Sequence, residues 1–292
     1  MSRDAQVQLI PDASIRVAAL RGFDELVGQL GGDPATLLES ERIAPSALAS
    51  PDERISYAAM IKLLERAANE LEIPDFGLRL STFQDINILG PAAMIALYSD
   101  TVGDCLEAIA TYFYVHTRGG VVRLIRSAPG ESKLTFEVLI TGLHAKRQIN
   151  ELSLGIGQRL LEILVAPGFR SARVEFSHCQ PDDLRPLRRR FGRQLVFDCP
   201  VNAISIPEAC LARVVPTANR EFRRIAIEYV REHLGSAEDN RVRRVALLAH
   251  QLLPTGRCSL ATIATVLGVH QRTLQRELRA AGTDFRSILD RA

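Results

Sequence analysis

The chain has 292 residues, of which 47% are hydrophobic and 24% charged, a composition typical of globular proteins that excludes a disordered chain and favours two domains. The net charge is only +2, but residues 216–292 hold 13 arginines against 8 acidic residues, and this excess suits contact with a nucleic acid. The longest uncharged stretch has 14 residues, and the five cysteines lack zinc-finger spacing, so a membrane span, a zinc site and a disulfide framework are not expected. The first twenty residues lack the apolar core of a signal peptide, and we expect a cytoplasmic protein with no membrane partner.

Helices are expected in the first third of the chain. Asp33 followed by Pro34 is a typical helix start, because aspartate caps a helix and proline fits its first position. Ser56 can cap the next helix, whose apolar residues fall on one stripe. The helices expected here cover residues 15–30, 57–71, 87–98 and 102–115, with a shorter one from Pro34.

The periodicity then changes to that of strands. Residues 121–126 are rich in β-branched side chains, and residues 134–140 alternate between apolar and polar, which predicts an antiparallel hairpin around Pro129 and Gly130. A long helix over 144–165 should cover it. Helices and strands are mixed without strict alternation, so the expected fold class is α+β rather than a doubly wound sheet. The remaining elements are strands near 174–176, 195–197 and 203–206, and a short helix over 181–190.

The chain becomes helical again after Pro216, which we interpret as a domain boundary. Helices are expected over 218–234 and 238–253, followed by two short ones. The first of them is a candidate dimer helix or linker.

The most informative segment is residues 259–278, whose apolar positions predict two short helices packed at an angle. Ala264 is small where a second helix must cross closely, and Gly268 follows where the chain turns sharply. Leu274 and Leu278 form the inner face of the second helix. Its remaining positions are mostly hydrogen-bond donors: His270, Gln271, Arg272, Thr273, Gln275, Arg276 and Arg279.

Such a row of donors is what a helix in the major groove of DNA needs. Arginine can bind guanine, and glutamine adenine, through two hydrogen bonds each. Thr273 and Arg279 are better placed for phosphates, which position the protein without specifying sequence. The alternative interpretation is a helical hairpin whose arginine face is simply solvated.

The segment resembles the first helix-turn-helix of the AraC family of transcription regulators. The resemblance implies that Arg272, Gln275 and Arg276 contact bases, because the matching family positions do so. His270 departs from the pattern, since a capping serine is usual there and histidine is a poorer cap. The matching residues are Ile263, Ala264, Leu267, Gly268, Arg272, Leu274, Arg276 and Leu278, then Gly282 and Phe285.

A second resemblance covers about residues 15–212. Phe76–Leu80, the Leu89-Gly90 step, Arg190–Gly192 and Val196-Phe197 are similar to the arabinose-binding-like N-terminal domain of one AraC subfamily. It implies a mixed α+β domain that responds to an amino acid, a fatty acid or another small carboxylate. The expected division is therefore an effector-binding and dimerisation domain over 1–215, a helical linker and start of the DNA-binding domain over 216–256, and the first helix-turn-helix over 257–292.

AraC-type DNA-binding domains contain two helix-turn-helices joined by a linker helix. Here the sequence stops at Ala292, inside what should be that linker helix, so we expect the second helix-turn-helix to be absent and operator binding to be weak. The alternative function is an effector-binding or dimerising protein whose DNA-binding part is too truncated to bind its operator.

An effector site is harder to place from sequence. Tyrosine and arginine near an apolar sheet can hold a carboxylate, although ordinary core and surface roles are the alternative. No acid–base or nucleophile constellation indicates an enzyme, and no cofactor or metal ion is expected. The expected partners are promoter DNA, a small effector, a second copy of the chain and RNA polymerase, with activation or repression left open. The candidate effector residues are Tyr112, Tyr114, His116, Arg118 and Arg147.

Overall fold

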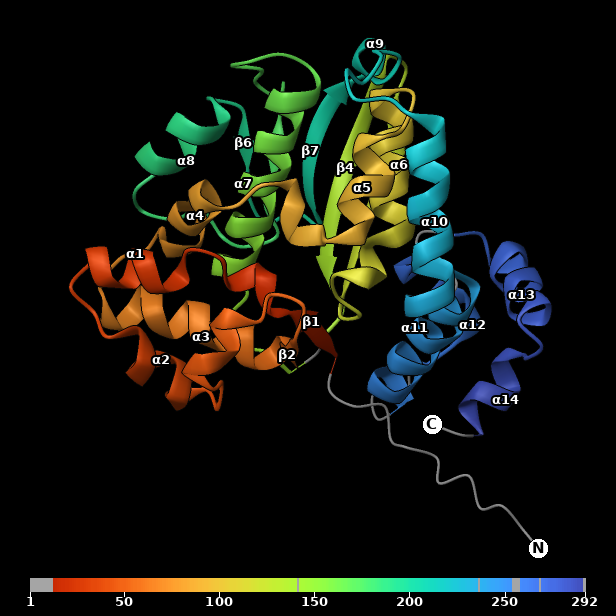
Figure 1. Ribbon diagram of the computed structural model, residues 1–292, viewed down its shortest axis with the longest axis horizontal. Helices are drawn as coiled ribbons and strands as arrows, with labels where there is room; N and C mark the ends of the chain where they lie inside the picture. Colours follow the sequence, from red (N-terminus) through yellow and green to blue (C-terminus); the bar gives the residue numbers. More distant parts are fainter. Residues whose placement is uncertain (1–12, 141, 236, 254–257, 268, 291–292) are drawn as a thin grey trace, which may run out of the picture.

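The structure is a computed structural model that describes residues 13–140, 142–235, 237–253, 258–267 and 269–290 (Figure 1). Its N-terminal part packs four helices beside a small antiparallel sheet of two strands. The Asp33 side chain accepts a hydrogen bond from the Ala35 amide at 3.1 Å, and the Ser56 hydroxyl accepts one from the Ala59 amide at 3.3 Å, so both predicted caps are confirmed. These elements are β1 (Ser14–Arg16), β2 (Arg54–Ser56), α1 (Phe23–Gln29), α2 (Pro34–Ser40), α3 (Tyr57–Glu70) and α4 (Phe76–Leu80).

The helix expected over residues 15–30 is wrong in its first half. Ser14 pairs with Ser56 across β1 and β2, a 3-10 helix follows at Val17–Leu20, and α1 begins only after Gly22. Gly22 has φ 79°, a left-handed conformation that glycine adopts at little cost and that interrupts a helix. Pairing with a distant strand therefore overrides the local helical periodicity.

A five-stranded sheet with the strand order β3-β4-β7-β5-β6 forms the centre of the molecule. The first two strands make the predicted antiparallel hairpin, with Val122 opposite Phe136 and Leu124 opposite Leu134. Among the strands that the structure describes, only β5 and β6 pair in parallel, so the combination of helices with a mostly antiparallel sheet confirms the α+β class. The strands are β3 (Gly120–Ala128), β4 (Glu131–Val138), β5 (Val174–Glu175), β6 (Leu195–Val196) and β7 (Asn202–Pro207).

The helices that cover the sheet are held by close contacts with their neighbours. The long helix α7 packs on α4 as well as on the sheet (Figure 1). At the crossing, a Cβ atom on Gly77 would lie 2.0 Å from the main-chain oxygen of Gln148, and the Gln148 side chain accepts a hydrogen bond from the Gly77 amide at 2.8 Å. Only glycine permits this approach. The helices are α5 (Pro91–Leu97), α6 (Val102–Tyr112), α7 (Arg147–Leu164), α8 (Arg185–Phe191) and α9 (Glu208–Leu211).

The C-terminal helices form a second hydrophobic core beside strand β3, which is an edge strand of the sheet. Helix α10 still belongs to the first core through Ala226 and Val230. Val121 and Leu139, from the N-terminal part, join the second core, so the two parts share an apolar contact. None of the described helices is long and apolar enough to cross a membrane. The helices are α10 (Arg220–Leu234), α11 (Ala237–Leu252), α12 (Leu260–Val266), α13 (Gln271–Ala280) and α14 (Phe285–Leu289).

Candidate functional site

Helices α12 and α13 pack as the sequence predicts. Ile263, Ala264, Leu274 and Leu278 are all buried in the second core. The Val269 amide donates to the main-chain oxygen of Ala264 at 3.0 Å, which closes the end of α12 before α13 begins. The predicted turn residue Gly268 lies outside the described residues.

The start of α13 is capped by a histidine. The Nδ1 atom of His270 accepts a hydrogen bond from the Arg272 amide at 3.2 Å, so this residue fills the place usually held by serine. Accepting this bond requires an unprotonated nitrogen, since a protonated imidazole has only donors. The cap therefore depends on a neutral His270.

Helix α13 lies at the outer edge of the molecule (Figure 1), and most of the predicted donor side chains are exposed on it. Within the described part of the chain, Arg272, Arg276 and Arg279 form no ion pair. The acidic residue of this helix, Glu277, instead pairs with Arg241 of α11 at 3.1 Å. The side chains of His270, Gln271, Arg272, Gln275, Arg276 and Arg279 are exposed, and that of Thr273 is half-buried.

The second core is also joined to the sheet by a buried arginine. Arg244 of α11 donates from Nη2 to the main-chain oxygen of Gly120 on β3 at 2.8 Å. Burial, together with the nearby charges of Arg241 and Arg123, lowers the pKa of Arg244 to about 10. The side chain still carries its charge at pH 7, so it ties the edge of the sheet to the helices that support α13.

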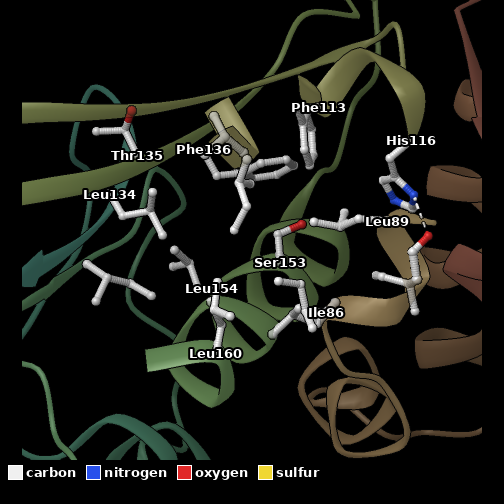
Figure 2. Close-up of a pocket in the computed structure, with 16 residues that line it drawn as sticks. Ile86, Leu89, Phe113, His116, Leu134, Thr135, Phe136, Ser153, Leu154 and Leu160 are labelled. Atoms are coloured by element: carbon white, nitrogen blue, oxygen red, sulfur yellow. Dashed lines mark hydrogen bonds between the residues drawn. The ribbon is translucent and has the colours of Figure 1, made fainter. Parts of the chain in front are cut away.

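A cavity of about 90 Å³ lies between α7 and the inner face of the sheet (Figure 2). Its walls are mostly aliphatic and aromatic side chains from α6, α7, β3, β4, β7 and the 3-10 helices at Ile86–Leu89 and Phe113–Val115. His116, which follows the second of these 3-10 helices, closes one end. The lining residues are Ile86, Ile88, Leu89, Ile109, Phe113, His116, Val122, Leu134, Thr135, Phe136, Ser153, Leu154, Ile156, Gly157, Leu160 and Ile204.

His116 is neutral at the cavity wall. Burial lowers the pKa of its imidazole to about 3, and the charge of Arg16 acts in the same direction. Its Nδ1 atom lies 3.1 Å from the main-chain oxygen of Ile88, which can only accept. Nδ1 therefore carries the proton, and Nε2 is the nitrogen of the ring that can accept a hydrogen bond.

The other candidate effector residues lie apart from this cavity. The Tyr114 hydroxyl donates to the main-chain oxygen of Gly235 at 2.8 Å, and Tyr112 packs against the Tyr114 ring. Arg118 is half-buried, and the pKa of its guanidinium is lowered by burial and by the charge of Arg243. Arg147 pairs with Glu151, so of the five candidates only His116 contributes to the wall.

Sequence reasoning missed most of the wall. Ile86 and Leu89 come from a 3-10 helix far from α7 in the sequence, and only the fold brings them to it. One local signal was present, because Ser153 has a small side chain and Gly157 has none, on a helix face that otherwise packs on the sheet. Such a pair leaves space where a leucine would fill it.

A buried carboxyl group on α7 supports a prediction about pH. Glu151 is fully buried, and its Oε1 atom lies 2.7 Å from Nε of Arg147. Burial raises the pKa of Glu151 to about 7, although Arg147 acts against this shift. The native state therefore binds the proton of the Glu151 carboxyl group more tightly than the unfolded chain does. The contribution of this group to the stability of the fold is complete below pH about 4.5 and is lost as the pH rises to about 7.

We expect Glu151→Gln to remove this pH dependence and to stabilise the protein at pH 8 by about 1–3 kcal/mol relative to wild type. Urea unfolding at pH 5 and pH 8 measures the difference. The control is Glu232→Gln, which changes an exposed glutamate of α10. An equal loss of stability between pH 5 and pH 8 in Glu151→Gln and wild type would contradict the prediction.

Comparisons with known proteins found several similar chains. The crystal structure of the transcriptional regulator CdpR from Pseudomonas aeruginosa aligns with 87% of this chain and 80% of its own, with a TM-score of 0.49 and 20% identity. The ornithine utilization regulator of Pseudomonas aeruginosa is 23% identical over 281 residues, which cover 94% of this chain and 81% of that protein.

Two further matches are more decisive. The HTH-type transcriptional regulator VirS of Mycobacterium tuberculosis is 34% identical over 279 residues, which cover 95% of this chain and 82% of VirS. The sequence model of the arabinose-binding domain of AraC transcription regulators, N-terminal, matches residues 31–215. The chain therefore belongs to the AraC family of transcription regulators and carries the arabinose-binding N-terminal domain of that family.

Proposed function

We propose that the chain is a transcription regulator and not an enzyme. It binds promoter DNA through α13, and a small effector bound by its N-terminal domain controls this binding. The observation that carries the proposal is the two-sided character of α13. Leu274 and Leu278 are buried, while Arg272, Gln275 and Arg276 are exposed. A supported helix with free donors on its outer face fits the major groove, which admits one helix.

Each donor of α13 has a role in this proposal. Arg272, Gln275 and Arg276 contact base edges, where bidentate hydrogen bonds distinguish guanine and adenine. Thr273 and Arg279 contact phosphates and fix the register of the helix on the duplex. The first residues, His270 and Gln271, lie at the end of α13 that enters the groove, as in other helix-turn-helix proteins.

Strand β3 connects the cavity with the helices that support α13. Val122 lines the cavity, whereas its neighbour Val121 packs in the second core, because successive side chains of a strand point to opposite faces. Gly120, one residue earlier, accepts the hydrogen bond from Arg244. A ligand that shifts β3 acts directly on the helices that support α13, and so changes the population of DNA-binding arrangements.

We expect the regulator to be a homodimer joined through α10. Phe222, Ile225 and Tyr229 are about half exposed, at 53%, 49% and 49%, and their spacing puts them in one row on this helix. Ile225→Asp would bury an unpaired carboxylate in the interface, and we expect the dimer dissociation constant to rise about 100-fold or more.

Sedimentation velocity across a range of protein concentrations measures this change. The matched control is Ile163→Asp, at an equally exposed isoleucine of α7, which should leave the dimer unchanged. A wild-type chain that stays monomeric, or an Ile225→Asp variant that dimerises as wild type does, would contradict the prediction.

Two further partners follow from the family resemblance. The resemblance implies that the effector is an amino acid, a fatty acid or another small carboxylate, and that the regulator meets RNA polymerase at the promoter. Both stay predictions, as does the expected cytoplasmic location.

Selection from a random duplex library tests the proposed function. The full chain is incubated with the library in low salt, bound DNA is recovered, and several rounds are sequenced. We expect enrichment of a short motif, and tighter binding to that duplex than to a scrambled one. Recovered DNA without a common motif would contradict sequence-specific recognition.

A further inference from the structure

We propose that the cavity between α7 and the central sheet is the effector site, and that it takes an uncharged, mainly apolar molecule with one hydrogen-bond donor, such as a hydroxyl group. The inference rests on the proposed function, because it names the effector class of the same regulator. It differs from the carboxylate that the family resemblance implies.

The walls of the cavity are almost entirely apolar. Among the described residues that line the cavity, none carries a charged side chain, and only His116, Thr135 and Ser153 are polar. A carboxylate that enters such a site loses its water without gaining an ion-pair partner, which costs several kcal/mol. An apolar molecule gains free energy from the same burial.

Arg16 is buried but does not supply a positive charge at the cavity wall. Arg16 lies close enough to His116 for its charge to lower the pKa of the imidazole, but it is not part of the cavity wall. Its Nη1 atom donates to the main-chain oxygen of Ile88 at 2.6 Å, and its Nη2 atom pairs with Asp52. The Nη1 and Nη2 atoms of Arg16 are therefore engaged within the fold and not with a ligand in the cavity.

His116 fixes the direction of the hydrogen bond that a ligand can form with it. Since Nδ1 holds the proton and points at Ile88, Nε2 can only accept. A hydroxyl group can donate to this lone pair, whereas the oxygens of a carboxylate would face it lone pair to lone pair. His116 thus favours a donor on the ligand and disfavours an anion.

The volume of the cavity limits the size of the ligand. The cavity of about 90 Å³ is of the same order as an engineered apolar cavity of about 150 Å³ in another protein, which stays dry and binds benzene. Ser153 and Gly157 keep this volume open, because they are small residues on the face of α7 toward the sheet. The site therefore fits a single ring or a short aliphatic chain.

Isothermal titration calorimetry of the full chain at pH 7 tests the inference with two matched pairs of probes. Hexan-1-ol is compared with hexanoate, and 4-ethylphenol with 4-ethylbenzoate. We expect saturable binding of at least one of the neutral probes, with a dissociation constant at least about 10-fold lower than that of its carboxylate partner, which corresponds to about 1.4 kcal/mol.

A cavity-filling variant locates the binding. Ser153→Phe should weaken binding of the neutral probe about 10-fold or more, while Ile163→Phe, on an exposed position of the same helix, should leave it unchanged. Circular dichroism melting establishes that both variants are folded. Ser153→Leu gives the same test with a smaller side chain should Ser153→Phe fail to fold.

Three results would overturn the inference: no saturable binding of either neutral probe, a carboxylate that binds as tightly as its neutral partner, or unchanged binding in a folded Ser153 variant. The calorimetry contains no DNA, so it is independent of the library selection. Binding of a neutral probe without motif enrichment would support the effector site and contradict the proposed DNA recognition. Motif enrichment without probe binding would support DNA recognition and contradict the effector site.

Discussion

Replacing both Arg272 and Arg276 by alanine is expected to lower the affinity for the selected duplex about 100-fold or more. Each arginine–guanine pair contributes about 1–3 kcal/mol of discrimination. At the middle of that range, the loss of one pair weakens binding more than about 10-fold, and the loss of two pairs more than about 100-fold. Neither side chain pairs with an acidic group in the described part of the chain, and both are exposed. The double variant should therefore melt at the wild-type temperature.

Fluorescence anisotropy with the selected and the scrambled duplex measures this effect. The ratio of the two affinities should fall toward one in the double variant, since base contacts specify sequence and phosphate contacts do not. Arg231→Ala, which removes an exposed arginine of α10, is the control and should preserve the ratio. An unchanged ratio in Arg272→Ala/Arg276→Ala would show that α13 does not read bases.

Gly77→Ala is expected to destabilise the protein by about 3 kcal/mol, the upper end of the range for overpacking a core. The added methyl group would sit 2.0 Å from the main-chain oxygen of Gln148 and 2.7 Å from its carbonyl carbon, so α4 or α7 must move. Because α7 also forms one wall of the cavity, the same shift should weaken binding of the neutral probes.

Urea unfolding measures the loss, and Gly28→Ala is its matched control. Gly28 is exposed near the end of α1, and a Cβ atom there meets nothing within 4 Å. Alanine at that helical position should stabilise the protein by about 0.5–1 kcal/mol. Equal effects of the two substitutions would mean that α4 and α7 do not cross as closely as described.

Local patterns allowed the sequence to predict the parts of the fold that depend on neighbours in the chain. The angle between α12 and α13 follows from Ala264, Leu274 and Leu278, all within 15 residues, and the β3–β4 hairpin follows from its period of two. The helix predicted over 15–30 was wrong because β1 pairs with β2, a contact that no local pattern reveals.

The cavity could not be predicted for the same reason. Its wall combines Leu89, Phe136 and Ser153 from three separate segments, and only tertiary packing sets the space between them. Of the five residues proposed from sequence, only His116 lines it, and it does so as a neutral acceptor and not as part of a carboxylate clamp. Tyr114 and Arg147 could bind an effector carboxylate by their chemistry, but Tyr114 donates its hydrogen bond to Gly235 and Arg147 pairs with Glu151.

The most direct test of the central claim, that α13 reads base edges, is a double-mutant cycle between protein and DNA. Each guanine of the selected duplex is replaced in turn by 7-deazaguanine, which lacks the N7 acceptor that arginine uses. Wild type and Arg276→Ala are then titrated with every duplex. The account predicts one guanine at which the two changes are non-additive, with a coupling of about 1–3 kcal/mol. Additive effects at every guanine, repeated with Arg272→Ala, would contradict it.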